Sequence, residues 1–219
     1  MVRFLCTGDW HGKRTYPKRV FIFAKKLSAD AILCTGDIVH KTSLDDAISL
    51  LSEIKLPIFF VPGNTDPPEL AIYENENVHS VHGKIVEFKG IKIAGVGASP
   101  PTPFESTYVL EESEISKFLD EYNPDILLTH APPAGTKLEI TWKRARGGST
   151  AIAHHISRFK PPVAICGHVH EAWGYQKIGT TLCVNVGSLP HAFFLEMNGS
   201  DVLSARFVRI PPLRKMERI

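Results

Sequence analysis

Five short apolar segments of this 219-residue chain each end in polar side chains of the kinds that bind metal ions. In chain order these side chains are Asp9, His11, Asp37, Asn64, His130, His168 and His170. A set of imidazole, carboxylate and amide groups without thiolate suits Mn, Fe, Zn, Co or Ni. Seven groups are too many for one tetrahedral ion but suffice for two ions if a carboxylate bridges them. We therefore expect a centre that holds two divalent cations.

The elements around these residues predict how they meet. Strand patterns at 3–7, 31–35 and 58–61 alternate with helix patterns at 17–27 and 44–54, an order typical of a parallel sheet. The carboxyl ends of parallel strands share one edge, where ligands bind, so distant residues can converge there. Asp9 and His11 are two apart in a segment that we interpret as extended, as are His168 and His170. Each pair is therefore expected to leave the backbone on one side.

The second part of the chain has a different pattern of predicted elements, with hairpins as well as strands and helices. Lys89-Gly90, Gly179-Thr180 and Asn198-Gly199-Ser200 are typical turn sequences and predict three hairpins. Further strands are predicted at 126–128 and 163–166, and helices at 111–122 and 150–158. The expected fold is one α/β domain over residues 1–219, with parallel and antiparallel pairing covered by helices.

The ordered motifs resemble the calcineurin-like metallophosphoesterase family over residues 4 to about 188. They are Asp9-Trp10-His11, Gly36-Asp37, Gly63-Asn64, His130 and Gly167-His168-Val169-His170. The resemblance implies a four-layer sandwich of two mixed sheets flanked by helices. It also implies that Asp9, His11 and His170 hold one metal, that Asn64, His130 and His168 hold the other, and that Asp37 bridges them. The loop 137–150 and the segment 184–188 are similar to small archaeal members.

The implied activity is hydrolysis of a small phosphate mono- or diester by a hydroxide that bridges two metals, with Mn expected first and Fe, Zn, Ni or Co as alternatives. Asp37, Asn64 and His168 are the expected catalytic residues. Many members carry a histidine after the Gly-Asn pair, where this chain has Thr65, which cannot act as an acid near neutral pH. His40 and His191 are candidates to replace it. Without such an acid, esters with good leaving groups are favoured.

Composition limits the partners and the compartment. A formal net charge of +2 disfavours nucleic acid and anionic membranes as partners, although a groove can still be basic locally. No apolar run reaches the roughly 20 residues of a membrane span, and the start lacks a signal-peptide pattern, so a cytoplasmic protein is expected. The four cysteines lie in strand-like runs without a CxxC pair and are expected to be buried thiols. A homo-oligomer is compatible with the sequence.

Several alternatives stay open. Asp9 or Asp37 alone could cap a helix, although this does not explain four histidines and an asparagine at the same strand ends. Trp10 either packs against the site or fills the core. Two further sets of basic residues either bind ligand or are solvated: Lys143, Arg144 and Arg146 in one loop, and Arg206, Arg209, Arg214, Lys215 and Arg218 with Glu217 in the tail. A non-catalytic interaction module on the same fold and a nuclease are the rival functions.

Overall fold

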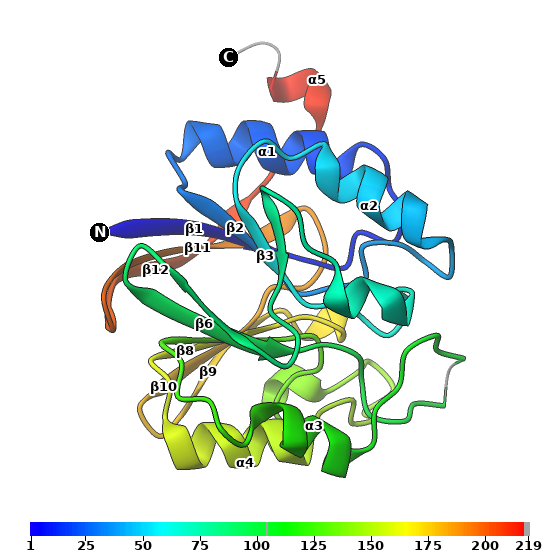
Figure 1. Ribbon diagram of the computed structural model, residues 1–219, viewed down its shortest axis with the longest axis vertical. Helices are drawn as coiled ribbons and strands as arrows, with labels where there is room; N and C mark the ends of the chain where they lie inside the picture. The colour runs from blue at the N-terminus through cyan, green and yellow to red at the C-terminus, as the bar shows by residue number, and fades with distance from the viewer. Residues whose placement is uncertain (104, 217–219) are drawn as a thin grey trace.

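Two mixed six-stranded sheets pack face to face and carry helices on their outer sides, which makes four layers (Figure 1). The computed structural model describes residues 1–103 and 105–216. The first sheet has the order β12-β11-β1-β2-β3-β4 and the second has the order β5-β6-β7-β8-β10-β9. This arrangement confirms the expected sandwich of two mixed sheets flanked by helices.

The first sheet joins a parallel half to an antiparallel half. Its strands are β1 (Val2–Thr7), β2 (Ala31–Cys34), β3 (Ile58–Phe60), β4 (Val78–Ser80), β11 (His191–Asn198) and β12 (Asp201–Arg209). Strands β1 to β4 run parallel, whereas β11 pairs antiparallel with both β1 and β12. The parallel half places the ends of β1, β2 and β3 on one edge, as the β-α-β-α-β pattern predicts.

The second sheet has a parallel centre and two antiparallel edges. Its strands are β5 (Ile85–Phe88), β6 (Ile91–Val96), β7 (Ile126–Thr129), β8 (Val163–Cys166), β9 (Gly174–Ile178) and β10 (Thr181–Asn185). Strands β6, β7, β8 and β10 run parallel, and the hairpins β5–β6 and β9–β10 close the edges. The ends of β7 and β8 therefore share an edge as well.

Three apolar cores hold the layers together. The first lies between the β1–β4 half and the helices α1 (Tyr16–Lys26) and α2 (Leu44–Ser52), and it encloses Trp10 completely. The second fills the space between the sheets, and the third lies under α3 (Glu112–Leu119) and α4 (Thr150–Phe159). Because both faces of each sheet are covered, the parallel strands β2, β3 and β8 are apolar throughout.

The predicted hairpins, the five predicted strands before the motifs and all four predicted helices are present. Strand β4 was not predicted, because three residues carry too little pattern. The tail begins later than Arg206, because Arg206 and Arg209 are exposed residues of β12 that lie opposite Phe194 and His191. Arg214 and Lys215 lie on the short helix α5 (Leu213–Met216), and Glu217 and Arg218 lie outside the described residues.

The four cysteines are buried free thiols, as expected. Burial raises the pKa of Cys183 to about 12, which keeps its thiol protonated and unreactive near neutral pH. Within residues 1–103 and 105–216, no helix combines the length and the apolar character needed to cross a bilayer.

Candidate metal centre

All seven predicted ligand side chains meet where five strands end. Four of them, Asp9, His11, Asp37 and His168, have backbone φ angles of 53°, 47°, 50° and 68°, in the left-handed region that residues other than glycine seldom adopt. Such conformations cost free energy and persist where the surroundings enforce them, often at functional sites. The expectation of extended segments was therefore wrong at both Asp-x-His and His-x-His.

The first half of the centre gathers Asp9, His11, Asp37 and His170. One potential ligand atom from each lies within 4.8 Å of those of the others. His170 Nε2 is 3.3 Å from Asp9 Oδ1 and 3.0 Å from His11 Nε2, and His11 Nε2 is 3.7 Å from Asp37 Oδ2. Asp9 Oδ2 is buried and accepts no hydrogen bond within the described part of the chain. The donor set is therefore available to a cation.

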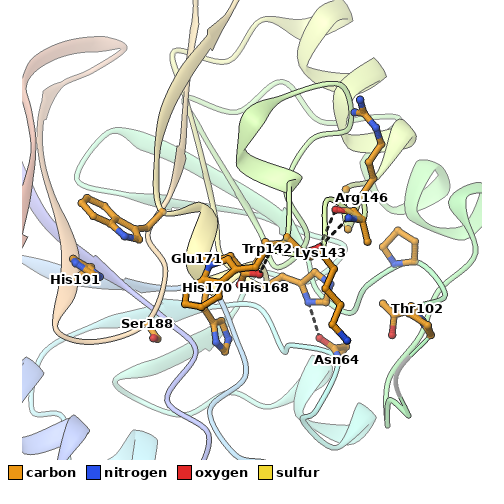
Figure 2. A pocket seen from close by; sticks show the side chains of 18 of the residues that line it. Asn64, Thr102, Trp142, Lys143, Arg146, His168, His170, Glu171, Ser188 and His191 are labelled. Atoms are coloured by element: carbon orange, nitrogen blue, oxygen red, sulfur yellow. Dashed lines mark hydrogen bonds between the residues drawn. The ribbon is translucent and has the colours of Figure 1, made fainter.

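The second half gathers Asn64, His130 and His168, of which Figure 2 shows Asn64 and His168. Asn64 Oδ1 is 2.9 Å from His130 Nε2 and 2.9 Å from His168 Nδ1, and the two imidazole nitrogens are 3.2 Å apart. His168 and His170 thus face different halves, because the left-handed backbone at His168 turns their side chains apart. The expectation that His168 and His170 leave the backbone on the same side was therefore wrong.

The proton positions in the second half follow from its hydrogen bonds. His130 Nδ1 is 2.7 Å from the Thr35 carbonyl oxygen, which only accepts, so Nδ1 carries the proton and neutral His130 presents a lone pair at Nε2. Asn64 donates its amide nitrogen to Ser106 Oγ, which turns the amide oxygen towards the imidazoles. His130 Nε2 and Asn64 Oδ1 are therefore both acceptors, and His168 Nδ1 beside them can supply at most one proton, an arrangement that a cation bound by all three would stabilise.

Asp37 connects the two halves. Its Oδ2 lies near His11, and its Oδ1 lies 3.6 Å from His130 Nε2 and accepts a 2.9 Å hydrogen bond from the Thr65 amide. A side chain at Gly63 would collide with this carboxylate, since a Cβ there would be 2.1 Å from Asp37 Oδ1. The glycine of the Gly-Asn pair is therefore required by close approach of the backbone to Asp37.

Burial and neighbouring charges set the protonation of these groups. Burial lowers the pKa of His11, and it lowers the pKa of His168 to about 4, with a further contribution from His130. Burial alone would raise the pKa of Asp9, but the hydrogen bond with His170 and the nearby imidazoles hold it below its usual value. Neutral imidazoles and ionised carboxylates are the forms that bind metals.

Thr65 is part of the framework of the site. Its hydroxyl is buried and donates a 2.8 Å hydrogen bond to the Val39 carbonyl oxygen. Beside it, the buried Asp66 carboxylate accepts hydrogen bonds from the amides of Val39 and Gly63, and burial together with Asp37 raises the pKa of Asp66 to about 7. Sequence reasoning missed Asp66, although it directly follows the Gly-Asn-Thr motif.

The two candidate replacement acids have different neighbours. His40 is exposed, with its ring centroid 5.6 Å from that of His11. His191 stacks on Trp173 with ring centroids 4.1 Å apart. Trp10 lies in the core and donates its ring N–H to Thr7 Oγ1, which resolves its role in favour of the core.

A cleft of about 990 Å³ opens above the second half of the centre. Asn64, His168 and His170 line its floor, and the loop that carries Lys143 and Arg146 lines one wall. The exposed tryptophans Trp142 and Trp173 were missed as candidate residues, and the proximity of Trp142 to the basic loop was the available signal. Arg144 of the same loop is exposed but does not line the cleft.

A profile of the calcineurin-like phosphoesterases matches residues 2–172. The chain belongs to this family. A relative from Methanocaldococcus jannaschii, the uncharacterized protein MJ1162, is 31% identical over 197 residues, which cover 85% of this chain and 88% of that one.

Solved structures of similar proteins share the calcineurin-like fold. TT1561 of Thermus thermophilus superimposes with a TM-score of 0.72 at 20% identity, covering 96% of this chain and 99% of that chain. A dimetal phosphatase from Danio rerio superimposes with a TM-score of 0.63 at 10% identity, with coverage of 96% and 99%. At these identities the likeness concerns the fold. As a member of the family the chain is a phosphoesterase with a candidate metal-binding cluster.

Proposed function

We propose that this protein hydrolyses phosphate esters with two divalent cations. Asp9, His11 and His170 would hold one cation, Asn64, His130 and His168 the other, and Asp37 would bridge them. Mn is the ion we expect first, with Fe, Zn, Ni and Co as alternatives of similar ligand preference. When bound, the cations supply a hydroxide nucleophile near neutral pH and neutralise charge on the phosphate.

The observation that carries this proposal is the inward orientation of lone pairs in the second half. His130 Nε2 and Asn64 Oδ1 are both acceptors and lie 2.9 Å apart, because their donors are used by Thr35 and Ser106. His168 Nδ1 lies 2.9 Å from Asn64 Oδ1 and 3.2 Å from His130 Nε2, so it can bring at most one proton to these two acceptors, whereas a cation would stabilise both. A structural hydrogen-bond network would pair a donor with each acceptor.

The protein's own groups have distinct tasks in this scheme. Asp37 orients one oxygen to each half, and its Oδ1 is held by the Thr65 amide. The cleft admits the ester next to Asn64 and His168. Thr65 supplies no proton to the leaving group, since its hydroxyl donates to Val39. His40 remains our candidate for that proton transfer, through its position beside His11.

The test replaces Asp37, the proposed bridging residue, and His168, one of the other proposed ligands. Asp37→Asn and His168→Ala should each lower turnover of bis(p-nitrophenyl) phosphate by at least about 10³-fold and reduce bound metal, measured by elemental analysis. His154→Ala, at an exposed position of α4, is the matched control and should retain both. Wild-type turnover in both site variants, with circular dichroism unchanged, would refute the mechanism.

A second candidate function is a non-catalytic metal-binding module on the same fold. The enclosed Thr65 hydroxyl favours it, because the position that often carries an acid has a structural role here. Metal-loaded wild-type protein that hydrolyses neither monoesters nor diesters would support this module. Measurable turnover that depends on Asp37 would exclude it.

A further inference from the structure

The cleft has two flanks on either side of the second half of the centre. In Figure 2, Thr102 lies on one flank and His191 and Ser188 lie on the other, with Asn64 and His168 between them. An ester bound at these two residues would therefore have protein on both sides of its phosphorus. The chemistry of the flanks determines which esters fit.

The loop that carries Trp142 is held by two acidic side chains. The buried Glu139 carboxylate accepts hydrogen bonds from the amides of Gly135 and Gly148 and pairs with Arg146 at 2.5 Å. On the other side, the Trp142 amide donates a 2.8 Å hydrogen bond to Glu171 Oε1. The loop is thus anchored at both ends, although the Trp142 side chain is 86% exposed at the cleft.

Lys143 is the cation of this loop that is available to a ligand. Arg146 is engaged by Glu139, and Arg144 does not line the cleft. Lys143 lines the cleft, and its side chain extends towards Asn64 (Figure 2). In the described part of the chain it forms no ion pair. Its ammonium group is therefore positioned for an anionic oxygen near the centre.

The flank that carries His191 presents a second flat surface. The Trp173 indole stacks on His191 at an interplanar angle of 14°, and Leu189 and Pro190 continue this flank. Trp173 is 45% exposed. Large aromatic side chains left exposed around a cleft are typical of ligand sites, where a bound group covers them.

We propose that the preferred substrate is a phosphate diester with a planar apolar substituent, which stacks on Trp142 while Lys143 binds a phosphoryl oxygen. This inference rests on the proposed function and specifies the substrate class of the same site. A diester carries two substituents on phosphorus where a monoester carries one. The cleft has protein on both sides of the expected phosphorus position, and its lining includes two exposed indoles, Trp142 and Trp173, so it offers apolar surface to both substituents.

Binding tests the stacking separately from catalysis. Calorimetric titration of the Mn-reconstituted protein should show diphenyl phosphate binding on the order of tenfold more tightly than dimethyl phosphate. Trp142→Ala should reduce this ratio at least about threefold and leave dimethyl phosphate binding unchanged. Ile72→Ala, which truncates another side chain that is 86% exposed but lies outside the cleft, is the matched control and should keep the ratio.

The lysine is tested in the same assay. Lys143→Met should weaken both diesters by a similar factor, about fivefold or more, and Lys143→Arg should restore most of the loss. Arg144→Met removes a cation of the same loop outside the cleft and should change neither affinity. In turnover of bis(p-nitrophenyl) phosphate, Trp142→Ala should raise KM with kcat retained, as expected for a group that binds substrate and transition state equally.

Two results would overturn the proposal: a diphenyl-to-dimethyl ratio that Trp142→Ala does not change, or higher kcat/KM for p-nitrophenyl phosphate than for its diester in the wild-type protein. Failure of the proposed function is a different outcome. In that case the metal-loaded wild-type protein turns over neither ester, while the calorimetric ratio still reports whether Trp142 stacks on the ligand.

Discussion

The strand ends that carry the candidate ligands and the walls of the cleft above them are built in opposite ways. At the strand ends, Asp9, Asp37, Asn64 and His130 are buried, and hydrogen bonds from neighbouring elements fix their orientation. The walls are loops whose prominent side chains, Trp142 and Trp173, are exposed. The first region leaves little freedom for substitution, whereas the second can change without disturbing the sheets.

This difference separates two tasks in space. Side chains on strand ends inherit the rigidity of the sheet, which suits groups that must hold ions at fixed distances. Side chains on loops contact the part of a ligand that differs between substrates. Variants of the strand ends should therefore affect metal binding and kcat, and variants of the walls should affect KM. The following predictions test this division.

Among the variants that test this division, the largest effect is expected at Gly63. A Cβ at this position would lie 2.1 Å from Asp37 Oδ1 and 2.3 Å from the Asp37 amide nitrogen, so Gly63→Ala must displace the Asp37 carboxylate. We expect at least about a 100-fold loss of kcat together with reduced metal content. Gly135→Ala, where a Cβ meets nothing within 4 Å and φ is +80°, is the control that adds a methyl group and backbone strain without a collision at Asp37. Unchanged kcat and metal content in Gly63→Ala would show that Asp37 tolerates displacement.

The buried His82, which lies behind the strand ends, should make the stability of the fold depend on pH. His82 Nδ1 accepts a hydrogen bond from the Gly97 amide, and burial lowers the pKa of His82 to about 4. Between about pH 6.5 and pH 4 the unfolded chain takes up a proton at His82 that the folded protein does not. The free energy of unfolding should therefore fall as pH is lowered through this window, by at most about 3 kcal/mol from this group.

The measurement is urea unfolding of the metal-free protein at several pH values, for the wild type and His82→Gln. The variant should show a shallower decline, although His155 and His168, whose pKa values burial also lowers to about 4, still contribute to it. His154→Gln, at the exposed position next to His155, should keep the wild-type dependence of the free energy of unfolding on pH. Equal slopes in wild type and His82→Gln would contradict the assignment.

A substitution in the wall of the cleft should have a smaller effect, on KM and not on kcat. Arg146→Met removes the cation from the buried Glu139 carboxylate, which keeps the amides of Gly135 and Gly148 as partners. The loop that carries Trp142 should loosen, so we expect KM for an aryl diester to rise on the order of three- to tenfold with kcat nearly retained. Lys137→Met, an exposed cation outside the cleft, serves as the control. A fall in kcat and metal content would instead couple this wall to the metal centre.

The smallest effect is expected at Thr65. Thr65→Val keeps the shape of the side chain and removes the hydrogen bond to the Val39 carbonyl. Stability should fall by about 1 kcal/mol, measured by urea unfolding, with kcat changed less than about twofold. Loss of kcat beyond tenfold at unchanged metal content would mean that the hydroxyl takes part in the reaction.

The sequence carried most of the information about the strand ends. Short apolar runs followed by Asp, Asn or His predict both the sheet and the edge at which these residues meet, because parallel strands end on one side. The left-handed backbone at His168 was beyond such reasoning, and with it the separation of His168 from His170. No periodic pattern encodes a single φ angle that tertiary contacts enforce.

The walls were less accessible to prediction. The basic residues of the 143–146 segment were recognised, but the sequence does not show that Arg146 is bound by Glu139 or that Arg144 lies outside the cleft. These outcomes depend on contacts between loops, which have no repeating pattern. Strand β12 was missed beyond Arg206 because its exposed edge carries charges that resemble those of a solvated tail.

The enclosed hydroxyl of Thr65 has a consequence for reactivity across a series of esters. A departing oxygen that receives no proton must leave as an anion, so its basicity controls the rate. For a set of substituted phenyl and alkyl diesters, the logarithm of kcat should decline steeply as the departing alcohol becomes more basic. A flat dependence would reveal a proton donor at the leaving oxygen, and His40 would then be the first position to replace.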